Sequence, residues 1–184
     1  MEVENRPTVK GIIVGCSVPT LVFSGLMLFI AMPNIIAWLG PNPPAPEITY
    51  GEFPFRIEYE LNGELIVIDD TLICEFVGFE LIGPKKIRSW KSRFVSGNGE
   101  GGYLLLQIVE NTNIYCCVGN PEYYMGDKDS YLYDVLPYDV LPYFARKKPG
   151  SGYYSSISTT ELLDKYGIKL IGWEFSEPIE NSFH

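Results

Sequence analysis

The chain has 184 residues, of which 46% are hydrophobic and 20% charged, and its formal net charge is −9. This composition excludes an intrinsically disordered chain and a collagen-like fibre. The acidic balance argues against nucleic acid as a partner, because binding to the phosphate backbone needs a basic surface. The placement of charge argues against a purely soluble protein, since no charged residue occurs from Gly11 to Pro46.

Residues 11–39 are almost entirely apolar and predict one transmembrane helix. A helix rises about 1.5 Å per residue, so a hydrocarbon core about 30 Å thick needs about 20 apolar residues. The run is long enough for one tilted crossing and too short for two. We expect Pro19 to kink this helix, Pro33 to end its regular part and Trp38 to lie at the interface.

The flanking charges predict the direction of the crossing. Arg6, Lys10 and the amino terminus precede the apolar run, whereas Glu47 and Glu52 are the first charges after it. By the positive-inside rule, residues 1–10 are cytoplasmic and the domain after the crossing lies outside the cell membrane. A cleaved signal peptide is the alternative, although the run exceeds the usual apolar region of about 7–15 residues and no A-x-A site ends it.

Residues 40–47 form a proline-rich linker, with four prolines between Gly40 and Pro46. Such a segment cannot be helical and should be extended and stiff. It separates the membrane from the domain predicted over residues 48–184.

From residue 48 the pattern changes to the two-residue period of β-strands. Aromatic and aliphatic side chains alternate with charged ones over residues 53–61, and Asn62-Gly63 predicts a type I′ turn into a partner strand over 64–69. Further strands are expected over residues 72–79, 87–95, 103–109, 114–118 and 168–175. The strand over 103–109 is nearly continuously apolar, so we expect it to be covered on both faces.

One short helix is predicted near the C-terminus, over residues 159–166. Ser158 and Glu161 have the spacing of a capping box, and Gly167 is placed to end the helix in a left-handed conformation. The predicted fold is therefore mainly β: after the transmembrane helix, an antiparallel β sandwich or open barrel with one short C-terminal helix.

Candidate catalytic residues are few, because the only histidine is the last residue, His184. Serine, cysteine or zinc chemistry that depends on an internal histidine is therefore excluded. No cofactor is expected either. The spacing Gly97-x-Gly99-x-x-Gly102 matches a dinucleotide fingerprint by letter, but a strand follows it where the fingerprint needs a helix.

An acidic segment begins like a calcium loop at Asp127-x-Asp129. Leu132 and Tyr138 occupy the positions where an EF-hand needs glycine and glutamate, so an EF-hand is excluded. A weak surface calcium site formed by Asp127, Asp129 and Asp134 remains as an alternative.

Three cysteines fall in the domain, and we interpret them as small core hydrophobes in preference to a disulfide between Cys74 and one of Cys116 and Cys117. Most of the domain's cations fall in two clusters, which we interpret as a solvated edge strand and a solvated loop. The alternative is that they contact anionic lipid headgroups or an anionic wall polymer. The clusters are Lys85, Lys86, Arg88, Lys91 and Arg93, and then Arg146, Lys147 and Lys148.

Eight of the 13 tyrosines fall within residues 123–154, interleaved with aspartates and with the tandem repeat Tyr-Asp-Val-Leu-Pro over residues 133–142. The repeated prolines predict a long structured loop. Tyrosine rings beside carboxylates suit stacking on a sugar or gripping a peptide, although the rings also suit simple coverage of a sheet face. The candidate ligand-binding residues are Tyr123, Tyr124, Tyr133, Tyr138, Asp134 and Asp139.

Several short motifs together resemble a family of uncharacterised, single-span bacterial membrane proteins. The motifs are Phe53-Pro54-Phe55-Arg56, Asn62-Gly63, residues 70–76, Trp90-Lys91-Ser92, residues 123–127, residues 162–169, Trp173-Glu174 and residues 178–181. The resemblance implies a bacterial envelope setting and no mechanism.

Together these observations favour a non-enzymatic, membrane-anchored extracytoplasmic module that binds an envelope protein or a glycan, with the lipid bilayer as partner of residues 11–39. One alternative is a carboxylate-dependent or calcium-assisted hydrolase acting on a cell-surface polymer. Another is a structural subunit whose transmembrane helix packs beside a larger membrane partner.

Overall fold

The computed structural model describes residues 29, 32, 36, 38–130, 132–133 and 141–184. The chain divides into two compact units, Met1–Asn42 with Leu81–Lys86, and Pro43–Glu80 with Ile87–His184. Within the described residues, no helix has both the length and the apolar character needed to cross a bilayer. Most of the predicted transmembrane segment lies outside the described residues.

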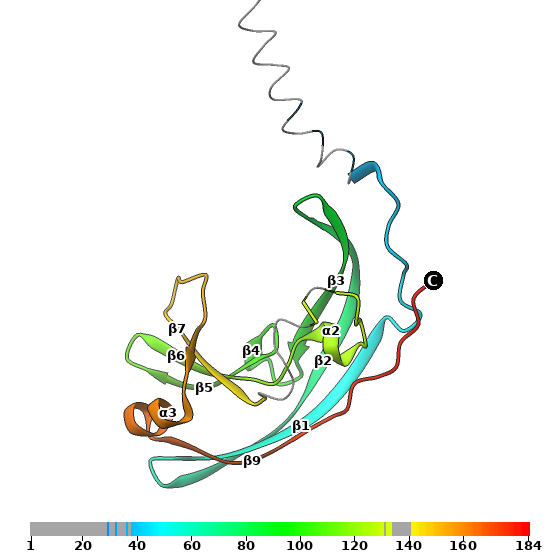
Figure 1. Cartoon of the computed structure of the whole chain (residues 1–184). Helices are drawn as coiled ribbons and strands as arrows, with labels where there is room; N and C mark the ends of the chain where they lie inside the picture. Colours follow the sequence, from blue (N-terminus) through cyan, green and yellow to red (C-terminus); the bar gives the residue numbers. More distant parts are fainter. Residues whose placement is uncertain (1–28, 30–31, 33–35, 37, 131, 134–140) are drawn as a thin grey trace, which may run out of the picture. The chain divides into compact units, whose positions relative to one another are not determined.

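The domain is built from two antiparallel sheets (Figure 1). The first has the order β3-β2-β1-β9, and the second has the order β4-β5-β6-β7-β8. Their bounds are β1 Tyr50–Leu61, β2 Glu64–Ile82, β3 Lys85–Phe94, β4 Gly99–Glu100, β5 Tyr103–Val109, β6 Thr112–Cys117, β7 Tyr143–Lys147, β8 Ser155–Ile157 and β9 Ile168–Phe175. The helices are α2 Pro121–Tyr124 and α3 Thr159–Tyr166. The prediction of a mainly β, antiparallel fold is confirmed.

The first hairpin has the predicted turn. Asn62 and Gly63 have φ values of 53° and 90°, as a type I′ turn requires, and Leu61 pairs with Glu64. The two strands expected over 64–69 and 72–79 are one continuous strand of 19 residues, β2. That division was wrong because Asp70 and Thr71, which lie between the two runs, pair with Phe55 and Pro54 of β1, and the pairing continues to Tyr50, opposite Glu75.

The second sheet differs from the prediction in several places, beginning with its edge strands β4 and β8, neither of which was predicted. Leu104 in β5 is fully buried, whereas Ile108 near the turn into β6 is 62% exposed, so β5 is covered on both faces over only part of its length. In addition, residues 143–147, which were predicted to be loop, form β7 and pair with β6. A strand is allowed there because it begins after Pro142, the last proline of the repeat.

The inner faces of both sheets share one hydrophobic core. It contains Ile57 from β1, Leu72 from β2, Leu104 from β5, Ile114 from β6 and Phe144 from β7. Cys74, Cys116 and Cys117 are free thiols, each fully buried, so the interpretation of these cysteines as core residues is confirmed.

Helix α3 begins and ends as predicted. Ser158 Oγ accepts a hydrogen bond from the Glu161 amide at 3.1 Å, and Gly167 adopts a left-handed φ of 66°. The Gly167 carbonyl also accepts a hydrogen bond from the Asn62 amide at 3.0 Å, which joins the end of α3 to the first hairpin.

Candidate functional site

A buried ion pair lies between β3 and the turn after α2. Arg88 Nε donates to Asp127 Oδ2 at 2.8 Å, and Arg88 Nη2 donates to Asp127 Oδ1 at 2.5 Å. Trp90 Nε1 donates to the same Oδ2 at 2.9 Å. The side chain of Arg88 is 7% exposed and that of Asp127 is 0% exposed, so the pair is withdrawn from solvent. The bond to Asp127 raises the pKa of the Arg88 guanidinium.

Local sequence explains how the three side chains meet. Arg88 and Trp90 are two residues apart on β3, so both lie on the same face of the sheet. Asn120 caps α2 by accepting a hydrogen bond from the Tyr123 amide at 2.9 Å. The Asp127 amide then donates to the Glu122 carbonyl at 2.8 Å, which fixes the turn that carries the Asp127 carboxylate.

This pair corrects two expectations. Arg88 is not part of a solvated edge, because it is buried against Asp127. Asp127 cannot serve as a surface calcium ligand, because N–H donors and a guanidinium charge occupy both carboxylate oxygens. Asp129 remains 85% exposed, and Asp134 lies outside the described residues. No group of three acidic, cysteine or histidine side chains suited to a metal occurs in the part of the chain that the structure describes.

The second basic cluster is also paired. Arg146 Nη1 donates to Glu161 Oε1 at 2.6 Å, and Lys147 forms an ion pair with Glu100. These residues lie in β7, so the interpretation of the cluster as a solvated loop was wrong for Arg146 and Lys147. Glu100 also accepts a hydrogen bond from the Tyr154 hydroxyl at 2.8 Å, and the bond from Lys147 lowers the Glu100 pKa.

Arg88 also joins the two ends of the domain. Its Nη1 donates to the Pro44 carbonyl at 3.2 Å, and its guanidinium lies 4.3 Å from the centre of the Phe183 ring. Pro44 belongs to the linker and Phe183 to the C-terminal residues 177–184, which we call the C-terminal strap. A single buried cation thus contacts the start and the end of the domain.

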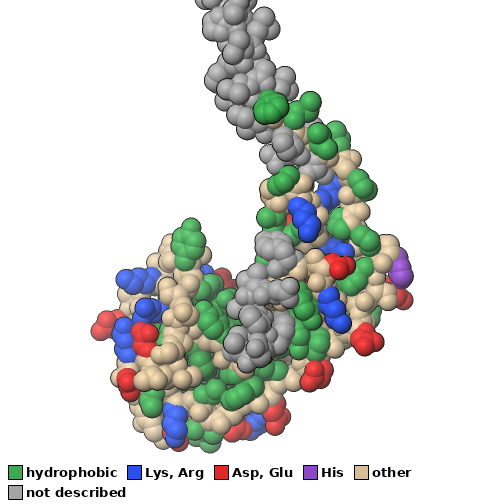
Figure 2. Space-filling view, viewed as in Figure 1, with side chains coloured by type: hydrophobic (Ala, Val, Ile, Leu, Met, Phe, Trp, Pro, Cys, Tyr) green, Lys and Arg blue, Asp and Glu red, His purple; other side chains and the backbone are tan. Residues whose placement is uncertain are grey.

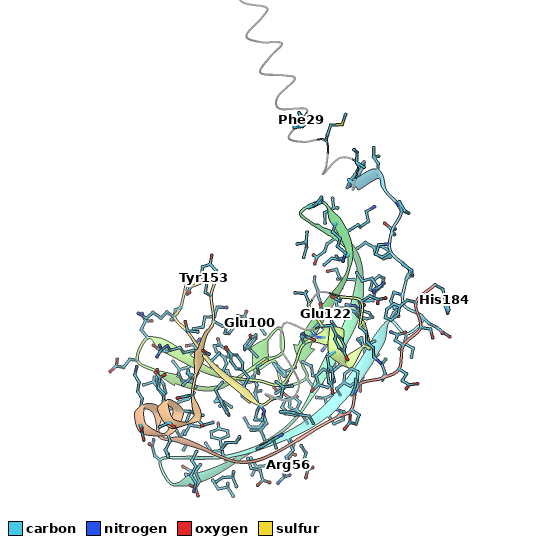
Figure 3. All side chains as sticks on the ribbon, viewed as in Figure 1. Phe29, Arg56, Glu100, Glu122, Tyr153 and His184 are labelled. Carbon is cyan, nitrogen blue, oxygen red and sulfur yellow. The ribbon has the colours of Figure 1, made fainter. Side chains whose placement is uncertain are left out.

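The C-terminal strap runs along the domain (Figure 3), and backbone hydrogen bonds hold it there. The Ile179 amide donates to the Tyr124 carbonyl at 2.9 Å, and His184 and Ala45 exchange two backbone hydrogen bonds of 2.8 and 2.9 Å. Figure 3 shows His184 at the end of the strap.

The side-chain amide of Asn181 adds three bonds to the strap. Its Nδ2 donates to the carbonyls of Ile48 and Met125 at 2.8 and 3.1 Å, and its Oδ1 accepts from the Ile48 amide at 3.0 Å. Gly126 allows this close approach, because a Cβ there would lie 2.5 Å from the Ile179 carbonyl oxygen. The strap therefore has a defined path over the turn after α2.

A groove of about 660 Å³ lies between this turn and the strap. The turn contributes Gly126, Lys128, Asp129 and Tyr133, and the strap contributes residues 177–183. Asp129 forms a long ion pair with Arg88, at 3.8 Å, but Glu177 and Glu180 are exposed and outnumber the one lysine, so the groove is acidic.

The structure separates the predicted tyrosines. Tyr133 lines the groove, and its ring centre lies 6.1 Å from that of Tyr123, which is half-buried. Tyr124 is 2% exposed, packs 4.7 Å from the Phe53 ring and donates its hydroxyl to the Val118 carbonyl at 2.6 Å. Tyr124 is thus a core residue that offers no surface to a ligand. Tyr138, Asp134 and Asp139 lie outside the described residues.

Sequence reasoning missed a buried carboxyl group, Glu122, which Figure 3 labels at α2. Its exposure is 4%, and burial raises its pKa to about 7, with the negative charges of Asp127 and Glu80 acting in the same direction. It does not line the groove. In the sequence, Glu122 is marked only by its position next to the tyrosine-rich segment that begins at Tyr123. That position does not distinguish a buried carboxyl from an exposed one.

Comparisons of the chain with models of known protein families, with curated proteins and with solved structures find no match. The arrangement of Arg88, Asp127, the strap and the groove therefore carries the functional proposal.

Proposed function

We propose that the chain is a membrane-tethered extracytoplasmic module, without catalytic activity, that binds a basic, extended polypeptide segment of an envelope partner. The observation that carries the proposal is the acidic groove between the turn after α2 and the C-terminal strap. The apolar residues 11–39 supply the tether, and the proline-rich linker separates the domain from the bilayer.

The chemistry of the groove supports this class of ligand. Asp129, Glu177 and Glu180 provide carboxylates that attract lysine or arginine side chains. Tyr133 provides a flat ring, on which an arginine or the stem of a lysine packs. A glycan is the competing ligand, because it uses the same ring without needing the acidic charge.

The shape of the groove is held by the buried pair. Arg88 contacts Phe183 of the strap, while Asp127 belongs to the turn that forms the opposite wall. A preformed groove binds a flexible segment at a lower entropic cost than a site that must first be ordered. The Arg88–Asp127 pair thus acts as a positioning element for the groove.

The alternative is a carboxylate-dependent hydrolase of a cell-surface polymer, and Glu122 is the observation in its favour. A carboxyl with a pKa of about 7 is suited to general acid catalysis near neutral pH. However, Glu122 is 4% exposed and lies outside the groove lining, so a polymer in the groove does not reach it. Release of product from wall material across about pH 4–8, abolished by Glu122→Gln, would favour the hydrolase.

Binding can be measured with the full chain in phosphatidylcholine nanodiscs and two fluorescent decapeptides, one of alternating lysine and serine and one of alternating glutamate and serine. Fluorescence anisotropy should show binding of the lysine peptide and none of the glutamate peptide. Tyr133→Ala and Glu180→Lys should each weaken binding about tenfold, which corresponds to about 1.4 kcal/mol.

A matched control is Glu64→Lys, which makes the same charge change at an exposed residue of β2 outside the groove. It should leave the affinity unchanged. An equal loss of peptide affinity in Glu64→Lys and Glu180→Lys would show that only net charge matters and would contradict a binding site in the groove. If the chain binds a wall glycan in preference to the lysine peptide, the proposed peptide ligand is wrong and the ligand is a sugar.

A further inference from the structure

The tip of the β2–β3 hairpin carries exposed apolar side chains next to lysines. Leu81 and Ile82 are 36% and 41% exposed, and after the turn at Gly83 and Pro84 the chain continues with Lys85 and Lys86. Figure 2 shows Lys and Arg side chains beside hydrophobic ones over this hairpin. Leucine and isoleucine at a hairpin tip add nothing to the core of the domain, so their burial requires a partner.

The same tip binds the end of the apolar N-terminal segment. Lys86 Nζ donates to the carbonyls of Trp38 and Gly40, both at 2.9 Å. Residues 81–86 belong to the same compact unit as the chain up to Asn42. Trp38 and Leu39 are 66% and 71% exposed, so this unit presents an aromatic ring and several aliphatic side chains together with lysine charge.

This combination has the composition of a membrane-interface surface. Tryptophan favours the headgroup level, aliphatic side chains favour the acyl boundary, and lysines extend their stems along apolar surface while the ammonium group meets anionic headgroups. The contact of Lys86 with Trp38 and Gly40 keeps the tip next to the end of the predicted transmembrane segment. This position favours the bilayer over a soluble protein as the partner of the tip. Glu80 is the one acidic residue beside the tip, and it precedes the two apolar residues.

We propose that the β2–β3 hairpin tip docks on the outer surface of the bilayer that holds the anchor, with Leu81 and Ile82 at the acyl boundary and Lys85 at anionic headgroups. The inference rests on the tether in the proposed function and goes beyond it, because it gives the domain a second membrane contact. Two contacts restrict how the domain turns on its linker, which a single flexible tether does not.

The test uses the full chain with Cys16→Ser in nanodiscs, with or without phosphatidylglycerol. A cysteine at Ile82→Cys is labelled with an environment-sensitive fluorophore, and the remaining cysteines, Cys74, Cys116 and Cys117, are fully buried. Nitroxide-labelled lipid should quench the probe at position 82, more strongly in the anionic discs than in phosphatidylcholine alone.

The matched control is Leu65→Cys, an exposed position on the same strand at the opposite end of β2. Its probe should not be quenched. Lys85→Glu, which removes a cation that makes no ion pair among the described residues, should abolish the additional quenching in anionic discs. These controls distinguish docking of the tip from general proximity of the domain to lipid.

Equal quenching at positions 82 and 65 would overturn the docking inference while leaving the tether intact. A probe at position 82 that becomes protected only as chain concentration rises, without quenching by lipid, would assign the tip to contact between two copies and would also overturn it. Failure of the chain to remain with the discs on a sizing column would overturn the tether, and the docking inference with it.

Discussion

Two arginines on the same sheet each pair with an aspartate, but the two pairs differ in geometry and have very different surroundings. Arg56 on β1 donates from Nη1 to both oxygens of Asp69 at 3.1 and 3.2 Å, and Arg88 on β3 makes two bonds to Asp127. The Arg56 and Asp69 side chains are 41% and 65% exposed, whereas those of Arg88 and Asp127 are 7% and 0% exposed. Both pairs join the same two residue types, so we attribute the difference in their expected contribution to stability mainly to burial.

The difference follows from what each pair joins. Arg56 and Asp69 lie directly opposite each other in the β1–β2 hairpin, which its own backbone register already holds. Arg88 and Asp127 join segments that share no strand pairing, and Arg88 also contacts the linker and the strap. Loss of the first pair leaves its strands in place, while loss of the second leaves a buried charge and frees the strap.

The largest expected effect is that of Asp127→Asn. The substitution keeps the shape of the side chain but removes the buried counter-ion of Arg88 and leaves only the exposed Asp129 carboxylate, 3.8 Å from Nη2. We expect the free energy of unfolding to fall by about 3–5 kcal/mol. Urea denaturation of the full chain in mild detergent, followed by tryptophan fluorescence, measures this change. A loss of unfolding free energy as small as that expected for an exposed ion pair would contradict the stabilising role of the buried pair.

The next effect is that of pH on Glu122. Its pKa is about 7 in the folded chain against an ordinary value of 4.5, so folding takes up a proton between these values and stability falls as pH rises from about 4.5 to 7. Glu122→Gln should remove this fall and raise stability at pH 8 by about 3 kcal/mol. Denaturation midpoints at pH 4.5 and 8 test it; an unchanged pH dependence in the variant would contradict the burial of this carboxyl.

A smaller effect is expected when the strap loses its side-chain amide. Asn181→Ala removes the bonds to Ile48 and Met125 and should cost about 1–2 kcal/mol, because these backbone groups regain water only in part. Asn181→Asp keeps the acceptor but turns a carboxylate oxygen toward the carbonyl oxygens of Ile48 and Met125, so its cost should be at least as large in the same denaturation experiment. Equal stability of all three chains would show that backbone bonds alone hold the strap.

The smallest effect is expected at the exposed pair. Asp69→Asn should leave the denaturation midpoint unchanged within error, because water and salt already screen this pair. The contrast with Asp127→Asn is the useful quantity, since both substitutions remove one carboxylate from an arginine that keeps a second one, Glu58 for Arg56 and Asp129 for Arg88. A marked fall in the denaturation midpoint of Asp69→Asn would contradict the distinction between the exposed and the buried pair.

Local patterns predicted much of the fold. The turn at Asn62-Gly63, α3 with its caps at Ser158 and Gly167, and the strands over 103–109 and 168–175 each depend on neighbouring residues, and the structure contains them. The continuity of β2 was missed, because whether Asp70 and Thr71 form a turn depends on the strands on either side.

The candidate site was predicted less well, because its parts are distant in sequence. Arg88 and Asp127 are 39 residues apart, and nothing near Arg88 distinguishes it from the exposed cations of its cluster. The segment around Tyr123 was identified, yet composition alone did not show that Tyr124 belongs to the core while Tyr133 lines the groove. Residues 178–181 of the strap belong to the motifs of the family resemblance, but that resemblance implies no mechanism, so the role of the strap follows only from its contacts.

The most direct test of the central claim, that the buried pair holds the strap and thereby the groove, is residue-resolved hydrogen exchange of the full chain carrying Arg88→Lys. Lysine keeps the charge but cannot make both bonds to Asp127. The account predicts that the amides of Ile179 and His184 exchange at least about tenfold faster, with little change at Ile57 in β1, while Arg56→Lys leaves the strap unaffected. Unchanged exchange of the strap in Arg88→Lys, or equal acceleration in both variants, would contradict the account.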